Sequence, residues 1–105
     1  VSRPNDDRGI LDAGSKTLTP ETTGDGYGYL VEYPQARLYR LNEEHAYVDF
    51  SACPDRPDVG DIVHIIPVHT CVTTNMHDMI YGVRGGWRDG AIEQRWDVAA
   101  RGKVW

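Results

Sequence analysis

The spacing of apolar residues in this chain is that of β-strands, and this spacing is the strongest constraint on its fold. Short segments rich in aromatic and β-branched residues alternate with turn signals built from Gly, Pro, Asn and Asp. No stretch longer than about one helical turn has the periodicity of an amphipathic helix. The segments expected to be strands are 29–33, 36–41, 45–50, 62–67, 79–83 and 91–96. The sequence therefore predicts an all-β fold of about six strands, arranged as a small β-barrel or sandwich.

Two pairs of these segments have the connections of β-hairpins. A short polar turn separates 36–41 from 45–50, where Ala46, Val48 and Phe50 alternate toward one face. The connection between 79–83 and 91–96 contains Gly-Gly and Asp-Gly steps, which are typical of hairpin turns. The most apolar segment is 62–67, and we expect it to supply a core strand.

The first 28 residues are dominated by Gly, Asp, Thr, Ser and Pro, with one apolar patch at Ile10-Leu11. We expect a connector, mostly loop, with one short strand. The glycine-rich run 24–28 lacks the spacing of a phosphate-binding loop and precedes no helix pattern, so it predicts a turn. Because the chain opens on Val1 within a polar stretch, we also expect it to be a piece of a longer protein.

Composition excludes several classes of function. The 105 residues fit one domain and leave no room for a (β/α)8 barrel. The net charge is −5 and no Lys/Arg cluster is present, so nucleic acid is not an expected partner. No apolar run reaches the roughly 20 residues that span a bilayer, and the first seven residues do not have the character of a signal peptide, so we expect a cytoplasmic protein without membrane contact. The two cysteines favour reduced thiols over a disulfide.

His69 and Cys71 form the most specific local feature, a His-x-Cys pair after the apolar segment 62–67. If the backbone stays extended to Cys71, both side chains lie on one side, with Cα atoms about 6.5 Å apart. Imidazole and thiolate are ligands that suit zinc, and a site with two protein ligands keeps open positions for water or substrate. The alternative is that His69 caps a strand end and Cys71 packs as a small apolar residue. Spacing alone favours that alternative.

Other residues carry weaker signals. His77 beside Asp78 has the arrangement of a third ligand with an orienting carboxylate, although a polar loop is favoured. His64 alternates away from its apolar neighbours and His45 follows two glutamates, so both are expected near solvent. The tryptophans at positions 87, 96 and 105 are expected to pack in the core and at its rim.

Several stretches, taken in order, form a pattern that runs over nearly the whole chain. They are Leu11-Asp12-Ala13-Gly14-Ser15-Lys16, Leu41-Asn42-Glu43-Glu44-His45, Val59-Gly60-Asp61, Ile65-Ile66-Pro67, His69-Thr70-Cys71 and 96–102. With them the chain resembles the C-terminal part of the pyridoxal-phosphate enzymes that include D-threonine aldolase and D-serine dehydratase, relatives of alanine racemase in architecture. Together the stretches are much more specific than any single motif.

The resemblance implies a division of labour between two parts. An N-terminal (β/α)8 barrel of the same protein would hold pyridoxal phosphate on a lysine, and residues 1–28 would be the connector and leading strand from that barrel. Residues 29–105 would form the C-terminal β-domain, in which His69 and Cys71 look like the ligands of a divalent metal. The cysteine favours zinc over manganese. Lys16 is not the cofactor lysine, and we expect its stretch to be the strand that leaves the barrel. Val68 departs from the family, which often has Asn before the His.

The expected function is that of a lyase acting on D-3-hydroxy amino acids, by retro-aldol cleavage or by dehydration. The resemblance implies a homodimer when the protein is full length, and predicts that these 105 residues by themselves are inactive. Two alternatives stay open: a non-catalytic β-module used for binding or structure, and a degenerate family member that keeps the metal site without turnover.

Overall fold

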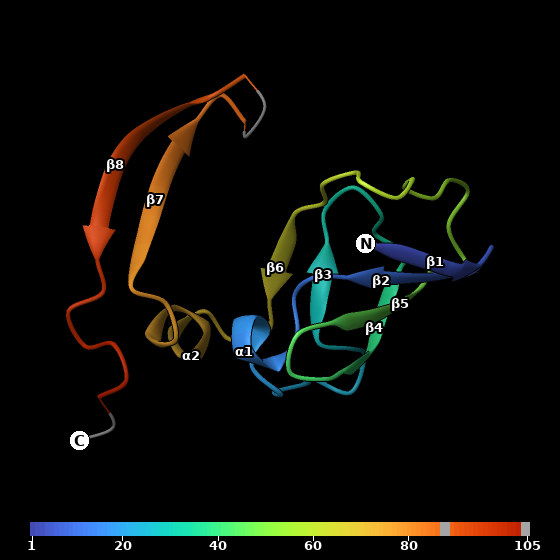
Figure 1. The fold of residues 1–105 in the computed structure, drawn as a ribbon, viewed down its shortest axis with the longest axis horizontal. Coiled ribbons are helices and arrows are strands. Elements are labelled where there is room, and N and C mark those ends of the chain that lie inside the picture. The colour runs from blue at the N-terminus through green and yellow to red at the C-terminus, as the bar shows by residue number, and fades with distance from the viewer. Residues whose placement is uncertain (87–88, 104–105) are drawn as a thin grey trace. The chain divides into compact units, whose positions relative to one another are not determined.

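The computed structural model describes residues 1–86 and 89–103, and its regular elements are mostly short antiparallel strands (Figure 1). The elements are β1 (Ser2–Asn5), β2 (Arg8–Leu11), α1 (Ser15–Leu18), β3 (Gly28–Leu30), β4 (Arg37–Leu41), β5 (Ala46–Asp49), β6 (Ile65–Pro67), α2 (Thr70–Asn75), β7 (Met79–Arg84) and β8 (Ala91–Asp97). The strands of the described residues form three antiparallel sheets. The all-β prediction is confirmed. Neither helix in the described residues has the length or apolar character of a membrane span.

The chain divides into two compact units, Val1–Thr70 and Cys71–Trp105. The first unit contains a four-stranded sheet in the order β1-β2-β5-β4. Its β4–β5 pair is the hairpin expected for 36–41 and 45–50, with Leu38 opposite Val48 and Leu41 opposite Ala46. The alternation of Ala46 and Val48 toward the core is confirmed, since both are fully buried.

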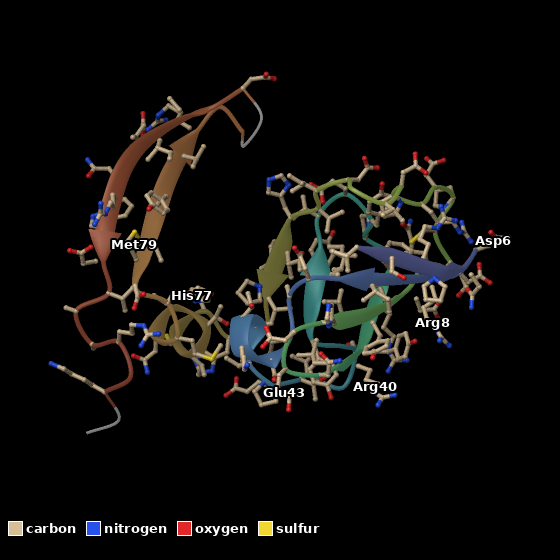
Figure 2. All side chains as sticks on the ribbon, viewed as in Figure 1. Asp6, Arg8, Arg40, Glu43, His77 and Met79 are labelled. Carbon is tan, nitrogen blue, oxygen red and sulfur yellow. The ribbon has the colours of Figure 1, made fainter. Side chains whose placement is uncertain are left out.

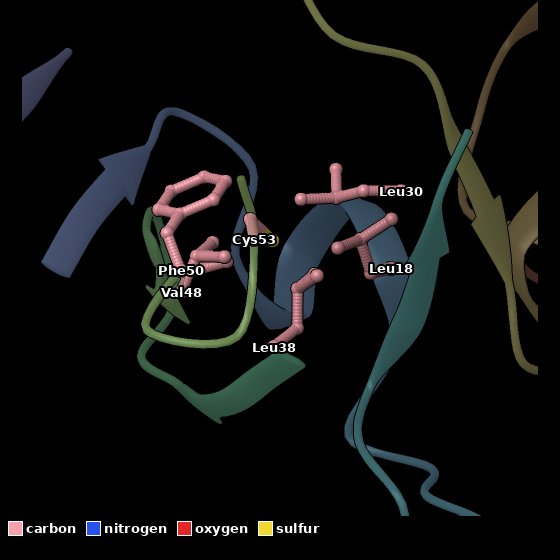
Figure 3. Packing of buried hydrophobic residues seen from close by; sticks show 7 residues of the cluster. Leu18, Leu30, Leu38, Val48, Phe50 and Cys53 are labelled. Carbon is pink, nitrogen blue, oxygen red and sulfur yellow. The ribbon is translucent and has the colours of Figure 1, made fainter. Parts of the chain in front are cut away.

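The core of the first unit is a small cluster of apolar side chains around Phe50 (Figure 3). The ring of Tyr33 meets that of Phe50 edge to face, with the ring centroids 5.5 Å apart. Gly9 in β2 lies under the same ring, and a Cβ there would come within 2.6 Å of it. The buried members of the cluster are Leu18, Leu30, Leu38, Ala46, Val48, Phe50 and Cys53.

Residues 1–28 differ from the expected loop with one short strand, because they contain β1, β2 and α1. β2 pairs with β5 inside the sheet, and β1 forms its edge. The turn between them is closed by the Asn5 side chain, which accepts hydrogen bonds from the backbone N–H groups of Asp7 and Arg8. The polar sequence of β1, with Pro4, suits an edge strand, where apolar alternation is not needed.

Lys16 lies in α1 and not in a strand, so that expectation is wrong. The first amides of α1 donate to the β4–β5 turn: Ser15 N–H to the carbonyl of Asn42, and Lys16 N–H to that of Glu43. Figure 2 shows Glu43 beside α1. The Lys16 ammonium also pairs with the Glu44 carboxylate at 2.5 Å. Two of the stretches that carry the family resemblance are therefore in contact, and their hydrogen bonds join α1 to the β4–β5 turn.

The segment expected as strand 62–67 is a strand only at Ile65–Pro67, where β6 pairs with β3. Ile62 is 55% exposed, so it is not a core residue, whereas Val63 and Ile65 pack against the core cluster. The expectation that His64 faces away from Val63 and Ile65 is confirmed, because its side chain is exposed and pairs with Glu32. β3 is likewise shorter than the expected 29–33.

The second unit contains α2 from Cys71 onward and the β7–β8 hairpin. The hairpin expected for 79–83 and 91–96 is confirmed. Its register pairs Ile80 with Trp96 and shifts between Gly82 and Val83. Trp96 is half-exposed and lies close over Gly82, where a Cβ would come within 3.0 Å of its ring. The other two tryptophans, at positions 87 and 105, lie outside the described residues.

Candidate metal centre

His69 follows β6 at the end of the first unit, and its side chain is half-exposed. The ring Nδ1 lies 2.9 Å from Oε2 of Glu21. A carboxylate accepts hydrogen bonds, so Nδ1 of a neutral His69 carries the proton and Nε2 keeps a lone pair. A contact of this kind fixes the orientation of a histidine ring, and metal-binding histidines commonly have one.

Glu21 is brought to His69 from the segment that follows α1. Thr19 ends that helix with φ 67° and ψ 158°, a region that residues other than glycine rarely occupy. It is nevertheless 1% exposed, and its N–H donates to the carbonyl of Ser15. The packing around Thr19 therefore holds it in this strained conformation, and Pro20 and Glu21 follow it in the chain. Nothing local in the sequence indicated Glu21, because 48 positions separate it from His69.

Cys71 is a free, exposed thiol in α2. The other cysteine, Cys53, is also free but belongs to the buried core, where burial raises the pKa of its thiol. A metal binds thiolate, and a thiol in apolar surroundings resists deprotonation. Of the two cysteines, Cys71 is therefore the one suited to coordination.

The extended geometry expected between His69 and Cys71 is wrong, because α2 begins at Thr70. Carbonyl groups near the end of α2 accept hydrogen bonds from residues that lie beyond the helix. His77 donates from Nδ1 to the Thr73 carbonyl at 2.8 Å, and Gly102 N–H donates to the Asn75 carbonyl at 3.2 Å. His69 and Cys71 therefore do not lie on one side of a common strand. Covalent geometry still limits the two Cα atoms to about 7 Å apart.

The alternative third ligand, His77 oriented by Asp78, is not formed as expected. Figure 2 shows His77 at the end of α2, where its ring caps the helix. The Asp78 carboxylate instead pairs with Arg101. Within residues 1–86 and 89–103, no group of three or more His, Cys, Asp or Glu side chains has the geometry of a metal site.

The fold defines the class of protein, a small, mostly β domain with several antiparallel sheets. The structure matches the crystal structure of D-threonine aldolase from Filomicrobium marinum with a TM-score of 0.81 and 34% identity, covering 99% of this chain and 27% of that one. Residues 1–83 match the putative serine dehydratase domain, and the chain belongs to this family.

Two relatives of very different length are similar to this chain in sequence. An uncharacterized protein of Mycobacterium tuberculosis is 40% identical over 96 residues, covering 90% of this chain and 69% of the relative. D-threonine aldolase of an Arthrobacter species is 35% identical over 102 residues, covering 97% of this chain and 25% of the relative. The resemblance found in the sequence is confirmed: the chain is homologous to the C-terminal part of these aldolases and spans about a quarter of their length.

Proposed function

We propose that this chain is the metal-binding β-domain of a pyridoxal-phosphate-dependent lyase that acts on D-3-hydroxy amino acids. The observation that carries the proposal is the His69–Glu21 pair, which leaves one ring nitrogen of His69 available at the half-exposed end of the first unit. Family membership supplies the context, because the aldolases it resembles share this domain. Cleavage and dehydration of the substrate both remain within the proposal.

His69 and Cys71 would hold the ion, and their donor chemistry fits zinc. Imidazole nitrogen and thiolate sulfur are the donors that zinc takes most often in proteins, and thiolate disfavours manganese. When bound, a divalent ion supplies Lewis-acid activation of a substrate hydroxyl, and pyridoxal phosphate supplies an electron sink for charge at Cα. The part of this chain is to hold the ion through two side chains and leave the remaining positions open. The cofactor lysine belongs to a barrel outside these residues, and we propose a homodimer as the full-length state.

The experiment uses the full-length protein and compares His69→Ala and Cys71→Ala with the wild type. Both variants should lose zinc and metal-dependent turnover of D-threonine or D-serine. The absorbance of bound pyridoxal phosphate should persist, because these residues do not hold the cofactor. His45→Gln is the matched control, since His45 lies in the β4–β5 turn region and has no part in the proposed site. Normal turnover by both alanine variants in the presence of chelator would overturn the assignment.

A second candidate function is a non-catalytic β-module. The Mycobacterium tuberculosis relative favours it, because 96 aligned residues make up 69% of that protein. A protein of that length cannot contain a (β/α)8 barrel, which takes about 250 residues. Domains of this family therefore occur without the barrel. Zinc binding without turnover in the full-length protein that carries this chain would favour the second candidate.

A further inference from the structure

We propose that Glu21 is a positioning residue that fixes the ring orientation and tautomer of His69, so that Nε2 is the nitrogen that would bind a metal ion. The inference rests on the proposed function, because it assigns a role to Glu21 in the same site. Glu21 Oε2 accepts from Nδ1 of His69 across 2.9 Å, and this contact decides which ring nitrogen carries the proton. Without an acceptor at Nδ1, the proton can occupy either nitrogen and the ring can turn.

The backbone before Glu21 limits where its carboxylate can lie. Thr19 is buried with a positive φ of 67°, and Pro20 fixes the next φ. The Glu21 N–H then donates to Oγ1 of Thr19 at 3.5 Å. The carboxylate is thus presented by an anchored stretch of chain at a position 48 residues from its partner. A positioning residue needs such an anchor, because a freely moving side chain would not hold a ring in one orientation.

A second histidine–carboxylate pair in the same unit, His64 and Glu32, is an example of a contact that joins two segments of the chain. Glu32 binds the ring of His64 and also accepts from the His64 backbone N–H at 2.9 Å, so it ties two chain segments together. No free thiol lies two residues from His64, whereas Cys71 lies two residues from His69. The Glu32 pair therefore serves as a matched control for a carboxylate that contacts histidine without a metal.

The test measures zinc affinity of the full-length protein, stripped with chelator and titrated with zinc against a chromophoric competitor. Loss of a residue that orients a metal ligand typically weakens binding by about 10–100-fold, and we expect this for Glu21→Ala. Glu21→Gln should recover most of the affinity, because its amide oxygen also accepts from Nδ1. Glu32→Ala should bind zinc as the wild type does.

A readout without metal separates the two proposals. Nitrogen NMR of the metal-free protein, with His69 assigned by substitution, should show the proton on Nδ1 in the wild type and its redistribution in Glu21→Ala. If Glu21→Ala keeps wild-type zinc affinity and the wild-type tautomer, the role of Glu21 is overturned while the ligand assignment stands. If the wild type binds zinc no more tightly than His69→Ala, the metal site itself is overturned, and the role of Glu21 with it.

Discussion

Replacement of Gly14 by alanine tests the contact that joins two of the family stretches. A Cβ at position 14 would lie 2.3 Å from the carbonyl oxygen of Asn42 and 2.4 Å from that of Glu43. Both oxygens belong to the backbone of the β4–β5 turn, so neither can swing aside. α1 must move away from the turn, which breaks the hydrogen bonds of 2.8 and 3.1 Å from the amides of Ser15 and Lys16.

The stability lost in Gly14→Ala can be estimated from these contacts. Two backbone hydrogen bonds contribute about 1 kcal/mol each, and overpacking adds about 1–3 kcal/mol. Alanine also lowers the conformational entropy of the unfolded chain, and this offsets about 0.4–1 kcal/mol of the loss. Gly14 has φ −107°, a conformation open to alanine, so no backbone strain is added. The expected loss of local stability is about 2–5 kcal/mol.

Amide hydrogen exchange in α1 measures this loss directly, because it reports local opening. A loss of about 2 kcal/mol lowers the protection of the Ser15 and Lys16 amides by roughly 30-fold. Gly24→Ala is the control: no atom lies within 4 Å of an added Cβ there, and φ is +96°. It should cost about 1–2 kcal/mol within its own loop and leave α1 protected. Unchanged protection of α1 in Gly14→Ala would refute the steric argument.

Three further outcomes are expected. Phe50→Ala should lower the free energy of unfolding by about 3–5 kcal/mol, since the side chain is 1% exposed; Ile66→Ala, at a position 54% exposed, should change it by less than about 0.5 kcal/mol in denaturant titration. Burial raises the pKa of Glu32, but hydrogen bonds from the ring and backbone N–H of His64 outweigh it and hold the pKa below the ordinary 4.5. The stabilisation by the Glu32 carboxylate is therefore complete above about pH 4.5 and is lost as the pH falls through its lowered pKa. Glu32→Gln should flatten the acid side of a plot of unfolding free energy against pH, and an unchanged plot would contradict this. The 105 residues by themselves should neither bind pyridoxal phosphate covalently nor cleave D-3-hydroxy amino acids, and aldehyde or ammonia release by this chain would disprove that division of labour.

The parts of the fold that sequence predicts well are those whose signal is local. The hairpins β4–β5 and β7–β8 join neighbouring segments, and their alternation and turn residues lie within about 20 positions of each other. β1 was missed because an edge strand needs no apolar face, and its sequence reads as loop. α2 was missed because Thr and Val dominate its six residues, and these favour strands. What holds α2 is the capping of its carbonyls by residues beyond it, such as the ring of His77.

The stretches that carry the family resemblance serve two different purposes. Packing explains the residues of two stretches, Leu11–Lys16 and Leu41–His45. The first stretch needs a glycine at position 14, because the carbonyl oxygens of the second stretch lie against it. His69 has no such role: it is half-exposed, contributes nothing to the core cluster, and contacts a carboxylate 48 positions away. An exposed histidine held by a carboxylate adds little to stability, because surface ion pairs contribute about 0–1 kcal/mol. The ligand role proposed for His69 is compatible with this position, because the fold does not depend on its side chain.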